Sequence, residues 1–259
     1  MEGESHRLSA FGSVFRSIID LIFPRTCAHC GKLIAEETPL EVICDECRQQ
    51  FRLLETGFTR THILSRLTPC YLDGLQVAFG ITPEILTIIH LVKYQKMPDL
   101  GVRLGLLAGE KLRGRLAAVN AGMILHPIPL FRRRRRKRGY NQSLCIARGM
   151  GRVWQTPVEN QKIFRVRNTA SQTTLDRQHR FENVSQAFRV KPETDFAFDT
   201  VVLIDDVVTT GATMNECARV LKAAGVRRVL GAAVATPLPG SLPDTPPEAR
   251  EFSPLSGLF

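Results

Sequence analysis

One stretch of the chain decides its fold: Val201-Val-Leu-Ile-Asp-Asp-Val-Val-Thr-Thr-Gly-Ala-Thr213. Its first four residues are apolar and mostly β-branched, which is typical of a parallel strand covered on both faces. The segment 214–224 that follows is rich in Ala, Leu, Glu, Arg and Lys, and Gly225 then favours the end of a helix. The stretch therefore predicts a buried strand that ends in two carboxylates, a short loop, and the start of a helix.

The loop between this strand and this helix has the composition of an anion-binding site. It consists of Thr209, Thr210, Gly211, Ala212 and Thr213. The first amides of a helix have no partner within the helix, and the helix dipole favours negative charge at that end. Glycine lets the backbone approach a ligand closely, and the threonine hydroxyls add hydrogen-bond donors. We therefore expect a phosphate group at this helix start.

The two carboxylates before the loop need a different ligand, because Asp205 and Asp206 repel phosphate. Carboxylates at the C-terminal end of a strand suit the vicinal hydroxyls of a ribose, or a magnesium ion bound through water. Together with the loop they predict a site for a sugar 5-phosphate whose diol faces two acids. An ordinary α/β turn with polar caps is the alternative, since Asp and Thr are favoured at such turns.

The order of hydrophobic strand, Asp-Asp, two residues and Thr-Thr-Gly-Ala-Thr resembles the phosphoribosyl-pyrophosphate (PRPP) loop of type I phosphoribosyltransferases. A Walker A loop does not fit, because no lysine follows Gly211. The resemblance implies that the two acids hold the ribose hydroxyls, that the loop holds the 5-phosphate, and that Mg²⁺ bridges pyrophosphate and diol. It assigns PRPP binding to Asp205, Asp206, Val207, Val208, Thr209, Thr210, Gly211, Ala212 and Thr213.

Four of the seven cysteines form two pairs, Cys27-Ala-His-Cys30 and Cys44-Asp-Glu-Cys47. Two Cys-x-x-Cys pairs supply the four thiolates of a structural Zn²⁺ site, so we expect Cys27, Cys30, Cys44 and Cys47 to bind zinc. A redox dithiol is the alternative for a single pair. His29 is a possible substitute ligand, although four thiolates already complete the shell. The isolated Cys70, Cys145 and Cys217 are expected to pack as small hydrophobic residues.

The positive charge of the chain is concentrated in one run, Arg132 to Arg138, whose seven cations leave only +3 of the net charge of +10 when subtracted. The run lies between a predicted strand, 122–130, and a predicted helix, 141–154, and we interpret it as a loop at the C-terminal edge of the sheet. Three interpretations remain open: a solvated face, a contact with single-stranded nucleic acid or a protein partner, and an active-site rim that binds PRPP and pyrophosphate. Arg138 is the best single candidate, because it directly precedes Gly139 and the helix start.

A polar excursion, 168–188, lies between strand-like segments at 162–166 and 187–190, and we interpret it as a lid or binding loop. Together with Arg138-Gly-Tyr-Asn-Gln142, it resembles the ComF/GntX branch of the phosphoribosyltransferases, which is associated with competence for DNA uptake. As a contact for a protein partner, the Arg132 to Arg138 run would then bind DNA-uptake proteins. The paired cysteines belong to the same pattern. The matching residues of the excursion are Gln172, Leu175, Arg180, Asn183, Val184 and Phe188.

The resemblance implies an α/β fold: a mostly parallel type I phosphoribosyltransferase sheet with helices on both faces, a small hood, and an N-terminal four-cysteine zinc module. The expected domains are 1–58 (N-terminal helix and zinc-binding module), 59–236 (phosphoribosyltransferase-like) and 237–259 (a Pro-rich, disordered tail). The sequence pattern predicts a hairpin over 71–81 that turns at Asp73-Gly74, helices at 83–93 and 100–116, and a strand at 226–235.

Composition places the 259-residue chain among soluble globular proteins, with 44% hydrophobic and 23% charged residues. No apolar run is long enough to span a bilayer. Residues 11–22 have helical spacing of apolar side chains but lack the pattern of a signal peptide, so we expect a docked amphipathic helix. A cytoplasmic location follows as an expectation, and it makes disulfides unexpected.

The implied reaction is displacement at C1 of PRPP by a nitrogen nucleophile, with Asp205, Asp206 and Arg138 as catalytic residues. Nothing in the excursion specifies an acceptor base. Lys93, near the end of a predicted helix, is a further candidate for the site, although a lysine at such a position more often lies on the surface with its charge in solvent. The alternative function is a non-catalytic, zinc-containing competence protein that binds nucleic acid or a partner and has a regulatory PRPP site.

Overall fold

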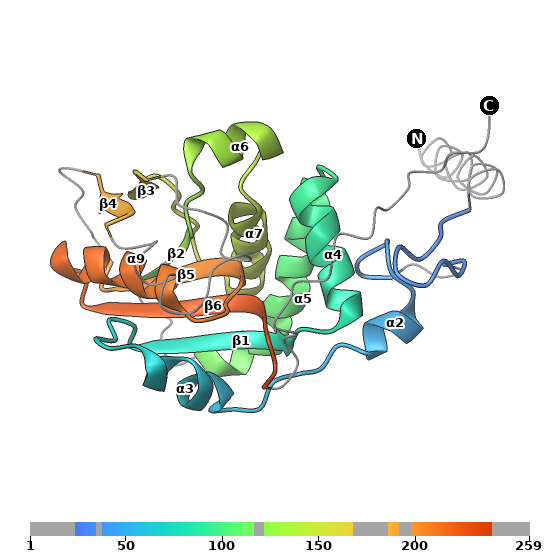
Figure 1. Cartoon of the computed structure of the whole chain (residues 1–259), viewed down its shortest axis with the longest axis horizontal. Helices are drawn as coiled ribbons and strands as arrows, with labels where there is room; N and C mark the ends of the chain where they lie inside the picture. The colour runs from blue at the N-terminus through green and yellow to red at the C-terminus, as the bar shows by residue number, and fades with distance from the viewer. Residues whose placement is uncertain (1–23, 35–37, 117–121, 168–185, 192–197, 240–259) are drawn as a thin grey trace, which may run out of the picture.

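The centre of the protein is a parallel sheet. The structure, a computed structural model, describes residues 24–34, 38–116, 122–167, 186–191 and 198–239. Its four-stranded sheet has the order β1-β6-β5-β2, formed by Gly74–Gly80, Arg228–Thr236, Thr200–Val207 and Met123–Pro127 (Figure 1). Every pairing is parallel. The expected helix at 11–22, most of the polar excursion and the tail from residue 240 lie outside the described residues.

The strand at the centre of the prediction, β5, is buried on both faces, as its apolar sequence requires. Val202 and Ile204 face one core cluster, whereas Val201 and Leu203 face the other. Pro127 at the end of β2 pairs in register with Ile204, one residue before the first carboxylate. The C-terminal ends of β2 and β5 therefore lie at the same edge of the sheet, as expected for parallel strands.

Helices cover both faces of the sheet (Figure 1). On one face lie α4 (Pro83–Tyr94), α5 (Pro98–Leu116) and α7 (Gln142–Trp154). On the other lie α9 (Ala212–Ala223), α3 (Phe58–His62) and the short 3₁₀ helix η1 (Leu64–Arg66). A Cβ on Gly105 of α5 would collide with Ile146 O, and one on Gly149 of α7 would collide with Val102 O. These glycines let α5 and α7 pack backbone against backbone.

Two local predictions are wrong. The expected hairpin at 71–81 is a single strand, β1, which pairs with β6. Asp73 does not turn the chain, because its amide donates to Val229 O (2.8 Å) and its carboxylate accepts from Val229 N (2.7 Å). The arginine run is not a loop but a helix, α6 (Arg132–Arg138), because arginine is a good helix former and Gly139, at φ +86°, closes the helix with a hydrogen bond to Arg135 O.

A separate two-stranded antiparallel sheet, β3 (Ile163–Arg165) and β4 (Phe188–Val190), takes the place of the expected hood. It is fastened to the main sheet by His126 of β2. The His126 Nε2 atom accepts a hydrogen bond from Ile163 N at 3.2 Å, and Nδ1 lies 2.9 Å from Pro127 O. Burial lowers the pKa of His126 to about 4, so the ring is neutral and serves as a structural bridge.

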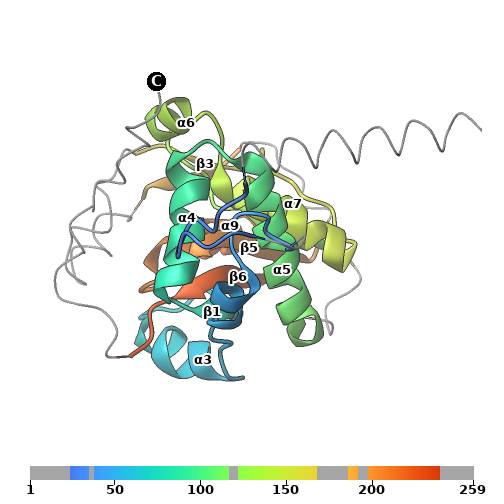
Figure 2. The same ribbon diagram turned by 90° about the vertical axis from the view of Figure 1, so that its right-hand side faces the viewer.

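The N-terminal cysteine segment, which includes α2 (Asp45–Gln49), packs onto α4 and α5 (Figure 2). Its Leu40 and Ile43 are fully buried in the same cluster as Ile85 and Ile88 of α4. At the rim, Glu41 Oε1 lies 2.7 Å from Arg103 Nη2. The module and the sheet thus share one hydrophobic core. Within the described part of the chain, no helix is long and apolar enough to cross a membrane.

Candidate functional site

The two predicted carboxylates close the buried part of β5. Side chains alternate between the two faces of a strand, so Asp206 turns toward the face covered by α4, and Asp205 turns toward the face covered by α9. The side chain of Asp206 is only 7% exposed, whereas Asp205 is half-buried. The strand therefore places the two acids side by side at the sheet edge but in different surroundings.

Asp206 forms an ion pair with Lys93 in the last turn of α4, with 2.6 Å between Nζ and Oδ2. Its other oxygen, Oδ1, accepts a hydrogen bond from Val207 N at 2.8 Å. Burial opposes ionisation of this carboxyl group, but the charge of Lys93 outweighs burial and holds the pKa of Asp206 below its ordinary value. Lys93, for which the sequence favoured a surface role, is thus in direct contact with the site.

Asp205 accepts a hydrogen bond from Ser143, with 2.8 Å between Oγ and Oδ1. Ser143 lies in the first turn of α7, where Asn141 caps the helix by accepting from Ser143 N at 3.1 Å. Burial and the neighbouring charge of Asp206 raise the pKa of Asp205 to about 7. Ser143 is not among the predicted site residues, although it lies within the helix predicted at 141–154.

The predicted phosphate loop begins where β5 ends. Val208 N donates to Ala235 O at 3.0 Å, which keeps the loop against the end of β6. Gly211, the N-cap of α9, has φ +77°, and a Cβ there would lie 2.9 Å from Ile63 Cγ2. Only glycine meets both conditions without strain. The half-buried Thr209, Thr210 and Thr213 surround this helix start, which is the arrangement expected of an anion site.

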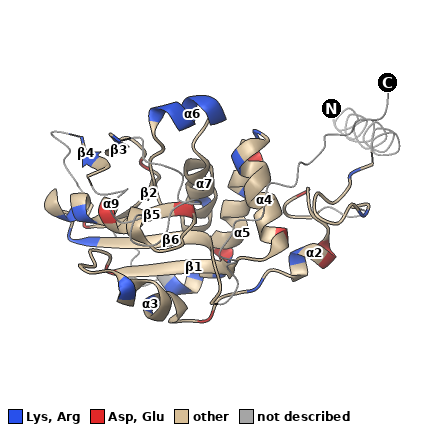
Figure 3. Ribbon diagram, viewed as in Figure 1, with Lys and Arg blue, Asp and Glu red and all other residues tan. Residues whose placement is uncertain are grey.

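Only two arginines of α6 turn inward. The whole of α6 is basic (Figure 3). Arg134 and Arg138, four residues apart and therefore on the same helix face, are half-buried, whereas the other five cations of the helix are exposed. Arg138 donates to Gln142 Oε1, and its guanidinium lies 5.6 Å from the ring centroid of Tyr94 in α4. The predicted residue Arg138 is thus held between α4 and α7, and the two residues that it contacts, Tyr94 and Gln142, directly neighbour Lys93 and Ser143 in sequence.

Arg165 of β3 is a further cation near Asp205 that the sequence did not indicate. Its guanidinium lies 5.2 Å from the ring centroid of Phe188. Burial and the like charge of Arg134 lower the pKa of Arg165, and the nearby Asp205 carboxylate opposes that change. Lys93 of α4 and Arg165 of β3 therefore lie near the two carboxylates, and Arg134 of α6 lies near Arg165, although these segments are far apart in the chain.

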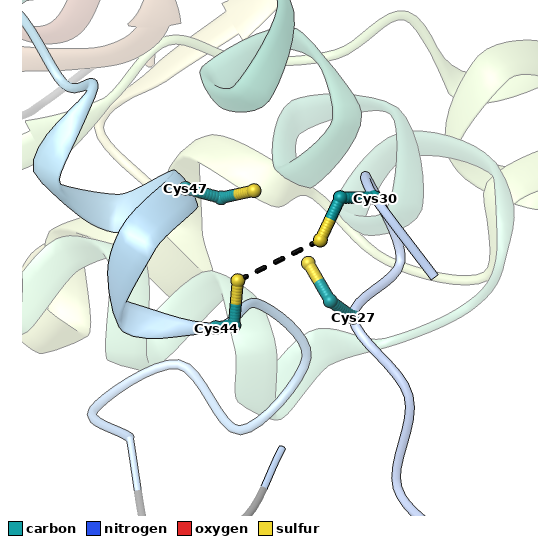
Figure 4. A group of neighbouring side chains, drawn as sticks. All are labelled: Cys27, Cys30, Cys44 and Cys47. Carbon is teal, nitrogen blue, oxygen red and sulfur yellow. Dashed lines mark hydrogen bonds between the residues drawn. The ribbon is translucent and has the colours of Figure 1, made fainter. Parts of the chain in front are cut away.

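The four paired cysteines converge in the N-terminal module (Figure 4). The sulfur atoms of Cys27, Cys30, Cys44 and Cys47 all lie within 4.8 Å of one another. Backbone turns position them: Gly31, at φ +77°, donates to Cys27 O, and Arg48 N donates to Cys44 O in α2. Burial raises the pKa of Cys47, and the other three sulfur atoms raise it further, a repulsion that a divalent cation would relieve.

The remaining cysteines and His29 lie outside this cluster. His29 contacts α4 instead, with Nδ1 3.0 Å from Thr87 Oγ1 and Nε2 3.5 Å from Glu84 Oε1. Cys145 and Cys217 are buried as expected, but the expectation is wrong for Cys70, which is exposed. The donor set of four thiolates within one small sphere fits a tetrahedral zinc knuckle.

Comparison with known proteins agrees with the arrangement of strands and loop. Residues 157–247 match the family model described as a phosphoribosyl transferase domain. The chain is 35% identical over 104 residues to competence protein F of Haemophilus influenzae, an alignment that covers 40% of this chain and 45% of that protein.

Two similar relatives share the printed name DNA utilization protein YhgH. The protein of Salmonella typhi is 34% identical over 156 residues, and that of Escherichia coli K12 is 31% identical over 149 residues. Both alignments cover 57% of this chain and 65% of the relative. The chain thus spans less than two thirds of the length of the curated relatives that it matches. The predicted resemblance is confirmed at this level: residues 157–247 match the phosphoribosyl transferase domain model, and the chain is similar to competence protein F and to the YhgH proteins.

Proposed function

We propose that this chain, a ComF-type protein with a phosphoribosyl transferase domain, binds PRPP together with Mg²⁺ and acts in the handling of DNA during uptake. The matched domain and the names of its relatives support the proposal. One observation gives the strongest support: Asp205 and Asp206 lie at the end of β5, next to the start of α9 at Gly211. Lys93 forms an ion pair with Asp206, and Ser143 donates a hydrogen bond to Asp205. This is the set of groups that a sugar diol and its 5-phosphate require.

The residues suggest how each part of PRPP is held. The amides at the start of α9 and the threonines of the loop bind the 5-phosphate. Asp205 and Asp206 accept hydrogen bonds from the ribose hydroxyls. Arg134 and Arg138, the inward-facing arginines, bind the pyrophosphate, whose negative charge grows as the bond to C1 breaks. Bound Mg²⁺ offsets part of the same charge, and carboxylate oxygens are the ligands it prefers.

Transfer of the phosphoribosyl group is a displacement at C1 by a nitrogen nucleophile, in which pyrophosphate leaves with the bonding electrons. The roles proposed for Asp205, Asp206 and Arg138 are to orient the ribose and to stabilise the leaving group, and no dedicated base is required. The acceptor binds on the side of the β3-β4 sheet, whose Arg165 lies near Asp205. Screening nucleobases and small amines for PRPP-dependent release of pyrophosphate tests turnover as distinct from binding.

We further propose that the four-cysteine cluster binds a structural Zn²⁺ and that residues 1–58, 59–236 and 237–259 are an N-terminal module, a phosphoribosyltransferase-like domain and a tail. The clustered thiols support zinc, and the end of β6 at Thr236 supports the last boundary. A cytoplasmic location suits a protein that uses PRPP and whose zinc-binding cysteines must stay reduced.

Calorimetry with PRPP and Mg²⁺ tests the proposed ligand. We expect saturable binding by the wild type and a loss of roughly tenfold or more in affinity for Asp205→Asn/Asp206→Asn, because two acceptors of charge-assisted hydrogen bonds are weakened. Asp199→Asn is the matched control: this exposed residue directly precedes the opposite end of β5 and pairs with Arg227. Absence of wild-type binding, or equal binding by the double variant, would overturn the proposed site.

Nucleic-acid or partner binding by α6, with PRPP as a regulatory ligand, is the second candidate function, favoured by the five exposed cations of that helix. Two double variants with the same change in charge distinguish PRPP binding from nucleic-acid binding by α6. Arg134→Gln/Arg138→Gln should weaken PRPP binding, whereas Arg132→Gln/Arg136→Gln, an exposed pair with the same spacing, should not. If α6 binds single-stranded DNA, the exposed pair should flatten the dependence of affinity on salt concentration.

A further inference from the structure

We propose that Lys93 is a positioning residue of the ribose subsite, where it fixes Asp206 as an ionised hydrogen-bond acceptor beside Asp205. The proposal rests on the proposed PRPP site and adds a residue from a different helix to it. Lys93 acts through Asp206 and does not itself need to touch the ribose.

The geometry leaves Asp206 little freedom. Lys93 Nζ lies 2.6 Å from Oδ2 in an ion pair, and Val207 N donates a hydrogen bond to Oδ1 at 2.8 Å, so each oxygen has one close positive or donor group. Oδ2 is buried and has no hydrogen-bond partner among the described residues, whereas Oδ1 can accept a second hydrogen bond besides that from Val207 N. The exposed fractions of the two side chains, 24% for Lys93 and 7% for Asp206, place the ion pair at the boundary of the core rather than on the surface.

The turn that carries Lys93 is itself anchored on both sides. Val92 O accepts a hydrogen bond from the hydroxyl of Tyr140, which lies between α6 and α7. The ring of Tyr94 lies 5.6 Å from the guanidinium of Arg138. The end of α4 is therefore fastened to the segment that carries the arginines, and Lys93 approaches Asp206 from a defined direction instead of sampling solvent.

The charges around Asp206 explain why a cation is needed there. Two neighbouring carboxylates in a buried position repel each other, and without compensation one or both take up a proton. Lys93 faces Asp206 from α4, and Asp205 faces it from β5; Asp205 in turn faces Ser143 of α7 and the charge of Arg165 in β3. Lys93 keeps the pKa of Asp206 low, while that of Asp205 is raised to about 7. The negative charge is thereby localised on Asp206.

Calorimetry with PRPP and Mg²⁺ between about pH 5 and pH 8, the range below and above the raised pKa of Asp205, tests this role in the full chain. We expect Lys93→Met to weaken binding roughly tenfold or more, because an unpaired buried carboxylate becomes protonated. The acid limb of its affinity profile should also move to higher pH. Lys93→Arg, which keeps the charge, should restore most of the affinity. Lys111→Met, at an exposed position of α5, should bind as the wild type does.

Carbon-13 NMR of the aspartate carboxyl groups measures the effect of Lys93 on the ionisation of Asp206 without PRPP. Asp206 should remain ionised across this pH range in the wild type and titrate within it in Lys93→Met. If the wild type binds no PRPP, the proposed function fails, but the NMR titration still decides the role of Lys93. A folded Lys93→Met variant with unchanged affinity, pH profile and Asp206 titration would overturn the inference. If that variant does not fold, Lys93→Met/Asp206→Asn removes both charges, and retained PRPP affinity in it would count against the proposal.

Discussion

The hydroxyl group of Ser143 donates a hydrogen bond of 2.8 Å to Oδ1 of Asp205 and so joins the first turn of α7 to the end of β5. This bond links two segments that are 62 residues apart in the chain. It opposes the rise in the pKa of Asp205 that burial and Asp206 produce. Ser143 therefore affects how readily Asp205 accepts a proton as well as where its carboxylate points.

Replacing Ser143 by alanine should weaken PRPP–Mg²⁺ binding roughly two- to tenfold, the effect of one net hydrogen bond of about 0.5–1.5 kcal/mol. The pKa of Asp205 should rise further, since a donor to the ionised form is lost. Calorimetry at several pH values measures both effects. Ser65→Ala is the control, because the hydroxyl of the exposed Ser65 donates to Thr61 O in the same segment, away from the two acids. If Ser143→Ala and Ser65→Ala bind PRPP with the same affinity, Ser143 does not contribute to the site.

Gly211→Ala should damage the phosphate loop by two effects. A residue other than glycine at φ +77° costs about 1–2 kcal/mol, and the added Cβ would also lie 2.9 Å from Ile63 Cγ2. Gly225→Ala provides a matched comparison, because Gly225 has φ +91° but open space around it. Urea unfolding should show a larger loss of stability for Gly211→Ala, and only this variant should lose PRPP affinity. Equal losses of stability in the two variants would mean that Ile63 moves aside at no cost and that its contact with the added Cβ has no effect.

The buried His126 should make stability depend on pH. Its pKa is about 4 in the folded protein, below the ordinary value of 6.5, so the unfolded chain takes up a proton first as the pH falls. The stabilising contribution is complete above about pH 6.5 and is lost as the pH falls toward 4, by at most roughly 3 kcal/mol. Urea unfolding of the wild type and His126→Gln at pH 4.5–7.5 measures it.

The stability of the wild type must be compared with that of His126→Gln, because Asp205 and Asp206 also titrate. Their contributions have opposite signs, since burial raises the pKa of Asp205 and Lys93 lowers that of Asp206. Both acids are present in the wild type and in the His126 variant, so the difference between the two stability curves isolates the imidazole. A constant difference across the pH range would show that His126 does not titrate as described.

Removal of one clustered cysteine should abolish metal binding. We expect about one equivalent of zinc in the purified wild type, little in Cys27→Ser or Cys44→Ser, and a full equivalent in Cys70→Ser, whose thiol is exposed and outside the cluster. Elemental analysis gives the content. The melting temperature should fall with the metal, because the module shares its core with α4 and α5. Zinc retained by Cys44→Ser would contradict the site.

The strand, loop and helix of residues 200–223 were predictable because every signal for them is local. An apolar run, a glycine at positive φ and a string of helix formers follow one another within a single segment. The four-cysteine cluster was predictable for a similar reason, since the spacing within each pair fixes two ligands at once. The position of β5 in a parallel sheet followed from its being apolar on both faces.

Contacts between distant segments could not be derived in this way. Asp73-Gly74 carries a hairpin signal, but pairing with β6 prevails over the local preference of two residues. Arg165 reaches the neighbourhood of Asp205 only because His126 fastens β3 to β2. Lys93 lies at a helix end that is compatible with solvent or with the site, and the packing of α4 on the sheet decides between them. These contacts depend on tertiary packing between distant segments, which a short stretch of sequence does not specify.

The inward face of α6 has a consequence for how sequence changes act on this edge of the protein. Deleting or inserting one residue turns the following part of a helix by about 100°. In α6 such a rotation brings another basic side chain to the position of Arg134, because every residue of the helix is basic. In β5 the same change would exchange the faces of Asp205 and Asp206 and separate each from its partner. The arginine helix tolerates slippage in register, whereas the acidic strand end does not.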